Sequence, residues 1–111
     1  MTTSVRFAIH GGGYIAKIHA KAVSETANAE LVAIAGRSGS ASELAKIAGV
    51  PWLDGEDGLV AAATRGEFDV AILCTPNTMH APVGLRLLDA GVHLLVEKPM
   101  TTSFADAQAL A

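Results

Sequence analysis

A glycine-rich stretch near the start of the chain carries the clearest chemical signal. Gly11, Gly13 and Ala16 match the spacing G-x-G-x-x-[GA], directly after an apolar segment. In such a turn the first glycine permits a tight bend, the second lets a pyrophosphate approach the backbone, and the small third residue allows close helix packing. Tyr14 and Ile15 open the helix that should follow, and its free N–H groups attract phosphate. The spacing predicts dinucleotide binding, with an ordinary glycine-rich turn as the alternative.

The position that distinguishes NAD from NADP lies after the second apolar segment. An NAD site usually has Asp or Glu about 20 residues beyond the glycine motif, where the acid binds the ribose 2′-hydroxyl. Gly36 lies at that spacing here, and Arg37 and Ser38 follow it. A guanidinium and a hydroxyl suit a 2′-phosphate, which an acid would repel. The residues therefore favour NADP over NAD, and the alternative for Arg37 is a solvated loop cation.

Two further groups of residues follow apolar segments. Thr75, Pro76 and Asn77 end the third segment, and Glu97 and Lys98 end the fourth. Ligands of parallel sheets bind beyond the carboxyl ends of the strands. We expect the first group to line the nicotinamide half of a crevice, although the same residues can also cap a helix. Lys98 can move a proton or steady an oxygen while hydride moves, and the alternative is a strand-end cation paired with Glu97.

Strands and helices must alternate along the chain to position these residues. Apolar segments of about five residues without strict polar alternation are typical of strands covered by helices on both faces. The expected strands are 5–9, 31–35, 70–74 and 92–96, with a short edge strand near 50–53. The expected helices are 14–26, 40–48, 57–65, 79–90 and 103–111. This alternation predicts an α/β fold with a doubly wound parallel sheet.

Some details of these elements follow from local patterns. The residues of the first helix that repeat at helical spacing, and are therefore predicted to face the core, are Ile15, Ile18, Ala22 and Val23. Ser40 stands three residues before Glu43, a capping-box spacing that predicts the start of the second helix. Trp52, beside Pro51, is interpreted as a plug in a surface loop.

The composition is that of one α/β domain and argues against several classes of function. Of 111 residues, 50% are hydrophobic and 17% are charged, which excludes intrinsic disorder. A net charge of −3 argues against nucleic acid as a partner. We expect no membrane span and no secretory signal, and hence a cytoplasmic protein. One cysteine excludes an intrachain disulfide, and four histidines without metal-binding spacing lead us to expect no metal.

Together the motifs resemble the amino-terminal domain of the Gfo/Idh/MocA oxidoreductases, the glucose–fructose oxidoreductase and inositol dehydrogenase family. The resemblance covers residues 5–110 and rests on Gly11-x-Gly13, Ile18-His19-Ala20, Thr75-Pro76-Asn77-x-x-His80 and Glu97-Lys98-Pro99. It implies a six-strand Rossmann sheet that binds NADP or NAD, followed by a larger α/β domain with the substrate pocket. We therefore interpret residues 1–111 as an NAD(P)-binding domain that stops before the sixth strand and the substrate domain.

The resemblance also implies roles for single residues. Lys98 matches the family's catalytic lysine. Glu97 matches the residue that approaches the nicotinamide ribose, with a solvated strand-end acid as the alternative. His80 matches the family's histidine at the start of its helix, and packing is favoured there over proton transfer. His19 is expected to brace loops near the cofactor, and His10 carries no motif.

Two functions follow from these observations. The first is an NAD(P)-dependent oxidoreductase that transfers hydride with a sugar, polyol or related carbonyl substrate in the complete enzyme, this chain alone being inactive. The second is a dinucleotide-binding sensor or scaffold without catalysis, since the fold does not separate the two. Another Rossmann protein, such as a methyltransferase, is disfavoured by the motifs at 75–77 and 97–99. For the complete enzyme we expect a small-molecule substrate, a homo-oligomer, and no nucleic-acid or membrane partner.

Overall fold

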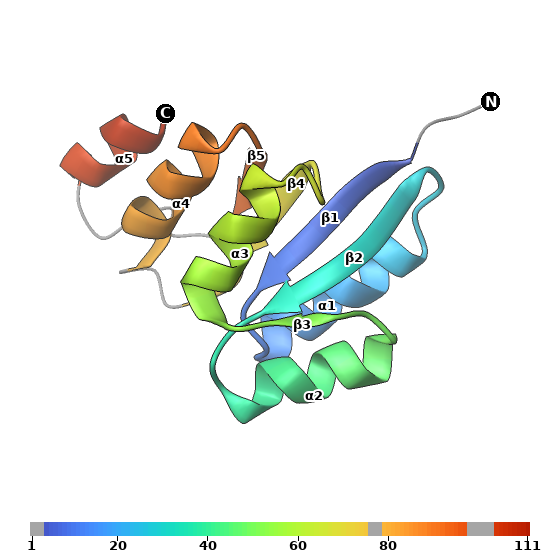
Figure 1. Ribbon diagram of the computed structural model, residues 1–111. Helices are drawn as coiled ribbons and strands as arrows, with labels where there is room; N and C mark the ends of the chain where they lie inside the picture. Colours follow the sequence, from blue (N-terminus) through green and yellow to red (C-terminus); the bar gives the residue numbers. More distant parts are fainter. Residues whose placement is uncertain (1–3, 76–78, 98–103) are drawn as a thin grey trace.

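The computed structural model describes residues 4–75, 79–97 and 104–111, and a parallel sheet lies at its centre (Figure 1). The strands pair in the order β3-β2-β1-β4-β5. Their bounds are β1 Val5–His10, β2 Ala29–Ala35, β3 Trp52–Leu53, β4 Val70–Leu73 and β5 His93–Val96. The predicted α/β fold with a doubly wound parallel sheet is confirmed, and the short strand lies at an edge because Pro51 cannot donate to a central ladder.

Helices cover both faces of the sheet (Figure 1). One face packs against α1 (Tyr14–Ser24) and α2 (Gly39–Ala48). The other packs against α3 (Gly55–Thr64) and α4 (His80–Asp89), and α5 (Phe104–Leu110) packs beside α4. Each expected helix is present, with ends shifted by at most two residues. Within the described ranges, no helix is long and apolar enough to cross a membrane.

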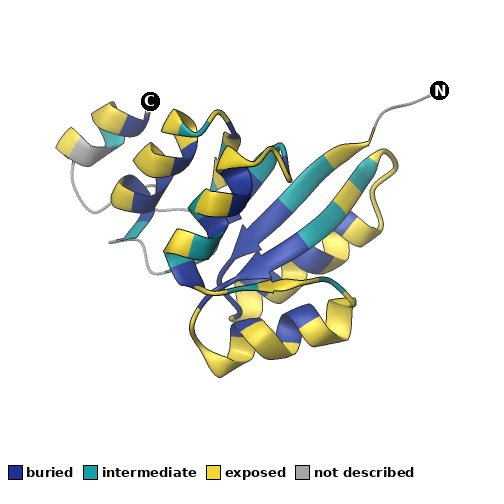
Figure 2. Ribbon diagram, viewed as in Figure 1, coloured by how far each residue is buried: buried dark blue, intermediate teal, exposed yellow. Residues whose placement is uncertain are grey.

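In each of the two core layers, large side chains from one element pack against small side chains from the other. The ribbon of the buried residues is dark blue in Figure 2. On the α1–α2 side the strands contribute Ile9, Ile34 and Ile72, and the helices contribute mainly alanines. On the α3–α4 side the strands contribute mainly alanines, and the helices contribute larger residues such as Leu59 and Leu87. This complementarity lets the helices approach the sheet closely, as dense interior packing requires.

The same packing shows that the predicted core-facing stripe of α1 was wrong for most of its residues. Ala16 and Val23 are buried, whereas Ile15, Ile18 and Ala22 are exposed. The isoleucines of the sheet already fill the space under α1, so a second layer of isoleucines would overpack it. The apolar spacing therefore identified a helix but misassigned the face that it buries.

The start of α2 and the place of Trp52 also differ from prediction. Ser38, not Ser40, caps the helix, because its Oγ accepts a hydrogen bond from the Ala41 nitrogen at 3.3 Å. Trp52 belongs to β3 rather than to a loop. Its indole Nε1–H donates to the Gly36 carbonyl oxygen at 2.7 Å. Both contacts order the segment that follows β2.

Candidate cofactor-binding site

A pocket of about 620 Å³ opens at the carboxyl ends of β1, β2 and β4. Its walls are the glycine turn after β1, the segment 36–40 after β2, the start of α3, and residues 74–75 with Met79 after β4. Parallel α/β sheets bind their ligands at this end, near the point where the strand order reverses. In this sheet that point lies between β1 and β4, inside the pocket.

Each glycine of the turn meets a different steric requirement. Gly11 has a φ of +121°, and a Cβ there would lie 3.0 Å from the Cys74 carbonyl oxygen. A Cβ on Gly12 would lie 2.2 Å from the Ala41 nitrogen, because the turn packs directly on α2. A Cβ on Gly13 would meet no atom of the described residues within 4 Å. Gly13 thus leaves open the backbone that a diphosphate would approach.

The start of α1 suits an anion. Gly13 caps this helix without a side-chain hydrogen bond, and the first turn contains no acidic residue. The N–H groups that α1 cannot satisfy internally are therefore not taken by a cap, and the helix dipole favours negative charge there. With the open backbone at Gly13, this end of α1 fits the diphosphate of a dinucleotide.

The segment after β2 explains why no acid stands at the NAD-selecting position. Gly36 has a φ of +152°, and a Cβ there would lie 2.8 Å from the Ala41 Cβ, so a residue with a side chain would be strained. Arg37 is consequently the first side chain after β2 at the pocket. It is 76% exposed, and its Nε lies 3.7 Å from Asp54 Oδ1. Such a loose, exposed pair leaves the guanidinium available to a ligand.

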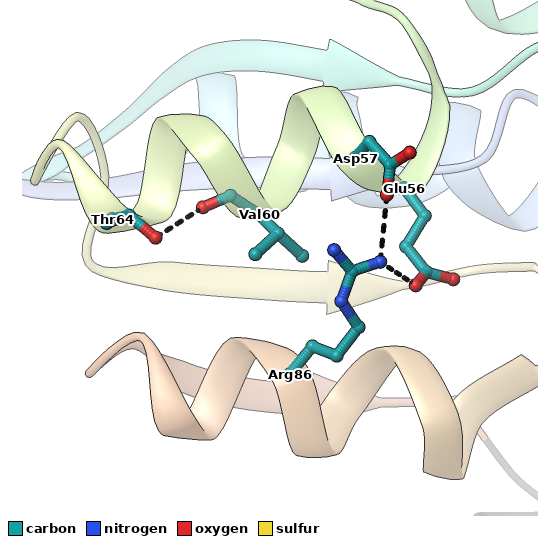
Figure 3. Close-up of polar contacts among 5 residues, drawn as sticks. All are labelled: Glu56, Asp57, Val60, Thr64 and Arg86. Atoms are coloured by element: carbon teal, nitrogen blue, oxygen red, sulfur yellow. Dashed lines mark hydrogen bonds and ion pairs between the residues drawn. The ribbon is translucent and has the colours of Figure 1, made fainter.

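The start of α3 adds acidic groups that the motifs did not indicate. Glu56 and Asp57 line the pocket, and Arg86 from α4 contacts both carboxylates (Figure 3). The Arg86 Nη1 to Asp57 Oδ1 distance is 3.0 Å. This cation partly neutralises the acidic wall and joins α3 to α4. The sequence does contain a pattern that could have drawn attention to them. They are a pair of acids in the first turn of a helix, where the helix dipole stabilises negative charge.

Two histidines brace the elements around the pocket. His19 on α1 contacts the Glu97 carboxylate beyond β5 through its Nε2. This contact links α1 to the end of β5, as expected for His19, and shows that Glu97 is not a freely solvated acid. His80 is buried, and its Nε2–H donates to the Thr75 carbonyl oxygen at 3.0 Å. That hydrogen bond supports the structural role favoured for His80.

Burial sets the ionisation of two further groups in the pocket wall. The pKa of the Cys74 thiol is raised to about 12 by burial, with a smaller contribution from Glu97. Cys74 is therefore a protonated thiol at neutral pH, as expected for an unreactive cysteine. Burial lowers the pKa of His10, Glu56 opposes that shift, and His80 adds to it. His10, to which the motifs gave no role, is thus a neutral imidazole in the pocket wall.

Some of the predicted site residues line this pocket. The predicted residues that line it are Gly11, Gly13, Arg37, Ser38 and Thr75. Ala16 instead lies on the buried face of α1, packed against the sheet, and Tyr14 and Ile15 have exposed side chains, so any contact from this turn of α1 would be made by backbone. Pro76, Asn77 and Lys98 lie outside the described residues, and their roles stay predictions.

Known proteins share this architecture. Residues 5–111 match the family model described as "Oxidoreductase family, NAD-binding Rossmann fold". The inositol 2-dehydrogenase of Rhizobium meliloti strain 1021 is 40% identical over 99 residues, which are 87% of this chain and 28% of that protein. The chain thus spans less than a third of this relative.

Two solved structures illustrate the likeness in three dimensions. Biliverdin reductase from Synechocystis sp. PCC 6803, in complex with biliverdin and NADP+, has a TM-score of 0.85 at 27% identity, over 96% of this chain and 33% of that one. The WlbA dehydrogenase from Bordetella pertussis, in complex with NADH and UDP-GlcNAcA, has a TM-score of 0.87 at 28% identity, over 96% and 32%. These neighbours therefore include complexes with either nicotinamide cofactor.

Fold, pocket and likeness together define an NAD(P)-binding Rossmann domain of the oxidoreductase class. More particularly, the chain belongs to the Gfo/Idh/MocA oxidoreductase family, as its motifs predicted.

Proposed function

We propose that this chain is the cofactor-binding part of an NADP-preferring oxidoreductase that acts on a hydroxyl or carbonyl group of a sugar, polyol or related compound. The observation that carries the cofactor preference is Arg37, the first side chain after β2, at the edge of a pocket whose other wall is the glycine turn. The substrate class is supported by relatives such as the inositol 2-dehydrogenase.

Different residues along the pocket would bind different parts of the cofactor. The glycine turn and the first turn of α1 would hold the diphosphate, and Arg37 with Ser38 would hold the 2′-phosphate. Ser38 Oγ accepts from the Ala41 nitrogen and lies 2.9 Å from Ser40 Oγ. With Ser40 as the donor of that pair, the Ser38 hydroxyl hydrogen can be donated to the ligand. Thr75 lies at the opposite end, toward β4 and β5. A bound NADPH would supply the hydride, and Lys98 would move the proton that accompanies it.

Arg37→Ala tests this cofactor preference. The 111-residue chain should bind NADPH more tightly than NADH in calorimetric titrations at fixed salt. The substitution should weaken NADPH binding by about 1–3 kcal/mol, the contribution of one charge-assisted contact, and change NADH binding little. Arg65→Ala is the matched control, because Arg65 is an exposed arginine that pairs with Glu67 outside the pocket. Equal affinities of the parent chain for the two cofactors would overturn the preference.

A further inference from the structure

Two buried polar atoms in the pocket wall have no hydrogen-bond partner in the described part of the chain. They are Nδ1 of His10 and Oγ1 of Thr75. His10 is only 2% exposed, and both residues line the cofactor pocket. Buried polar side chains are nearly always hydrogen-bonded, to protein, water or ligand. The two atoms are therefore open to a partner that enters the pocket, either water or a ligand.

The strands place these two residues at the centre of the sheet. His10 is the last residue of β1, and Thr75 follows β4 by two positions. The two strands are neighbours, and the Cys74 nitrogen donates to the His10 carbonyl oxygen at 2.9 Å. Both residues thus lie on the β4 side of the glycine turn, whereas Arg37 lies on the β2 side.

The surrounding groups restrict what the partner can be. Glu56 from α3 lines the same pocket as His10, His80 from α4 is close enough to His10 to act on it electrostatically, and Arg86 pairs with the Glu56 carboxylate. A neutral imidazole has one donor and one acceptor nitrogen, and a threonine hydroxyl can both donate and accept. A hydroxyl group complements both in either tautomer of His10. A phosphate oxygen only accepts, and it would lie near the Glu56 carboxylate.

We propose that His10 Nδ1 and Thr75 Oγ1 form a hydrogen-bonding subsite for a ribose hydroxyl of the bound dinucleotide, in its nicotinamide half. This inference rests on the proposed function, because it requires a dinucleotide whose diphosphate lies at the glycine turn. The nucleoside on the Arg37 side then occupies the β2 half of the pocket, and the second ribose reaches the β4 half. His10 would then contact the cofactor in its nicotinamide half and not in its adenosine half.

Two ligands and three variants test the subsite. NADPH contains both riboses, whereas adenosine 2′,5′-bisphosphate contains the 2′-phosphate but lacks the second ribose. His10→Phe removes both ring nitrogens at similar volume, and Thr75→Val removes the hydroxyl. Each should weaken NADPH binding about two- to tenfold, the contribution of one hydrogen bond, and leave the bisphosphate affinity unchanged. His10→Gln, which keeps a donor and an acceptor, should recover part of the loss. Calorimetry at fixed salt measures all affinities.

Other outcomes separate this inference from the proposed function. Unchanged NADPH affinity in Thr75→Val and His10→Phe would show that water alone satisfies the two atoms, and would overturn the subsite. Equal losses for both ligands would overturn it as well, since the effect would then be structural. If the parent chain bound neither ligand, the proposed function would fail and the subsite with it. Circular dichroism verifies folding, and Thr75→Val decides the matter if His10→Phe does not fold.

Discussion

At the scale of single residues, His10 couples the stability of the domain to pH. Burial holds its pKa below the ordinary 6.5 in the native state, against the opposing effect of Glu56. The unfolded chain therefore binds more protons at this residue, and its contribution to stability, present above pH 6.5, is lost as pH falls below it.

The variant His10→Phe isolates this contribution, because the other histidines are the same in both proteins. The free energy of unfolding should fall less steeply with decreasing pH in the variant than in the parent, by up to about 1.4 kcal/mol per pH unit. Urea unfolding of the ligand-free chains between about pH 5 and pH 7 measures both slopes. Identical slopes would show that His10 is not buried in its neutral form.

Lys98 carries the chemical prediction of the motif Glu97-Lys98-Pro99. The chain alone should show no hydride transfer with inositol or glucose, because the family resemblance places the substrate pocket in a second domain, and positioning supplies on the order of 7–11 kcal/mol of barrier reduction. A chimaera with the following part of the Rhizobium meliloti inositol 2-dehydrogenase should gain activity. In it, Lys98→Met should lower kcat about 10²–10⁴-fold and change NADPH binding little. A chimaera that retains its full rate without the lysine would make Lys98 a strand-end cation.

At the scale of elements, β3 holds the segment after β2 through one side-chain and one backbone hydrogen bond. The Trp52 indole donates to the Gly36 carbonyl oxygen, and the Gly36 nitrogen donates to the Leu53 carbonyl oxygen at 3.2 Å. These two bonds tie both polar groups of Gly36 to the edge strand. Arg37 begins directly after this anchored residue, so the direction of its backbone depends on β3.

Trp52→Phe removes the indole hydrogen bond and keeps an aromatic ring on β3. We expect the free energy of unfolding to fall by about 1 kcal/mol, and NADPH affinity to fall more than NADH affinity. Circular dichroism is the appropriate readout of unfolding, because Trp52 is the single tryptophan of the chain. Ile47→Ala, on an exposed position of α2, should change neither quantity. Equal losses for NADPH and NADH would show that Trp52 stabilises the fold without orienting Arg37.

At the scale of the whole molecule, β5 is an edge strand of the described sheet. It pairs with β4, its side chains alternate between exposed and half-buried, and Leu95 is 42% exposed. Leu95 shares the sheet face of its partner Ile72, which α1 and α2 cover. On the other face, α4 carries two further exposed apolar residues, Leu85 and Leu88. Unpaired backbone groups with apolar side chains promote association between copies.

We therefore predict self-association of the 111-residue chain at micromolar concentrations and above. Light scattering should give a mass larger than the 11.4 kDa of one chain. Leu95→Lys should shift the mass toward the monomer, because a charged side chain on an edge strand disfavours strand addition. Ile47→Lys, which adds the same charge on α2, should not. A monomer at every concentration would contradict this predicted self-association.

The sequence alone determined the order of the elements and the chemistry of the glycine turn. Both depend on local physics. Apolar segments of strand length and the spacing Gly11-x-Gly13 act over a few neighbouring residues, so they can be identified without the fold. The family followed from the same short motifs.

Only the tertiary structure decided which surfaces meet. Ile15 and Ile18 satisfy helical spacing, yet they face outward because Ile9, Ile34 and Ile72 already fill the space under α1. Such competition for volume between distant residues leaves no trace in local spacing.

The composition of the pocket was decided in the same way. Gly12, His10 and Glu56 line it because β1, α2 and α3 converge there, although no motif singles out His10 or Glu56. The absence of an acid at Gly36 has a steric reason, its φ of +152° and its contact with Ala41, which a count of residues cannot supply. Contacts between residues far apart in the chain are a property of the fold, and they determine which side chains a cofactor would meet.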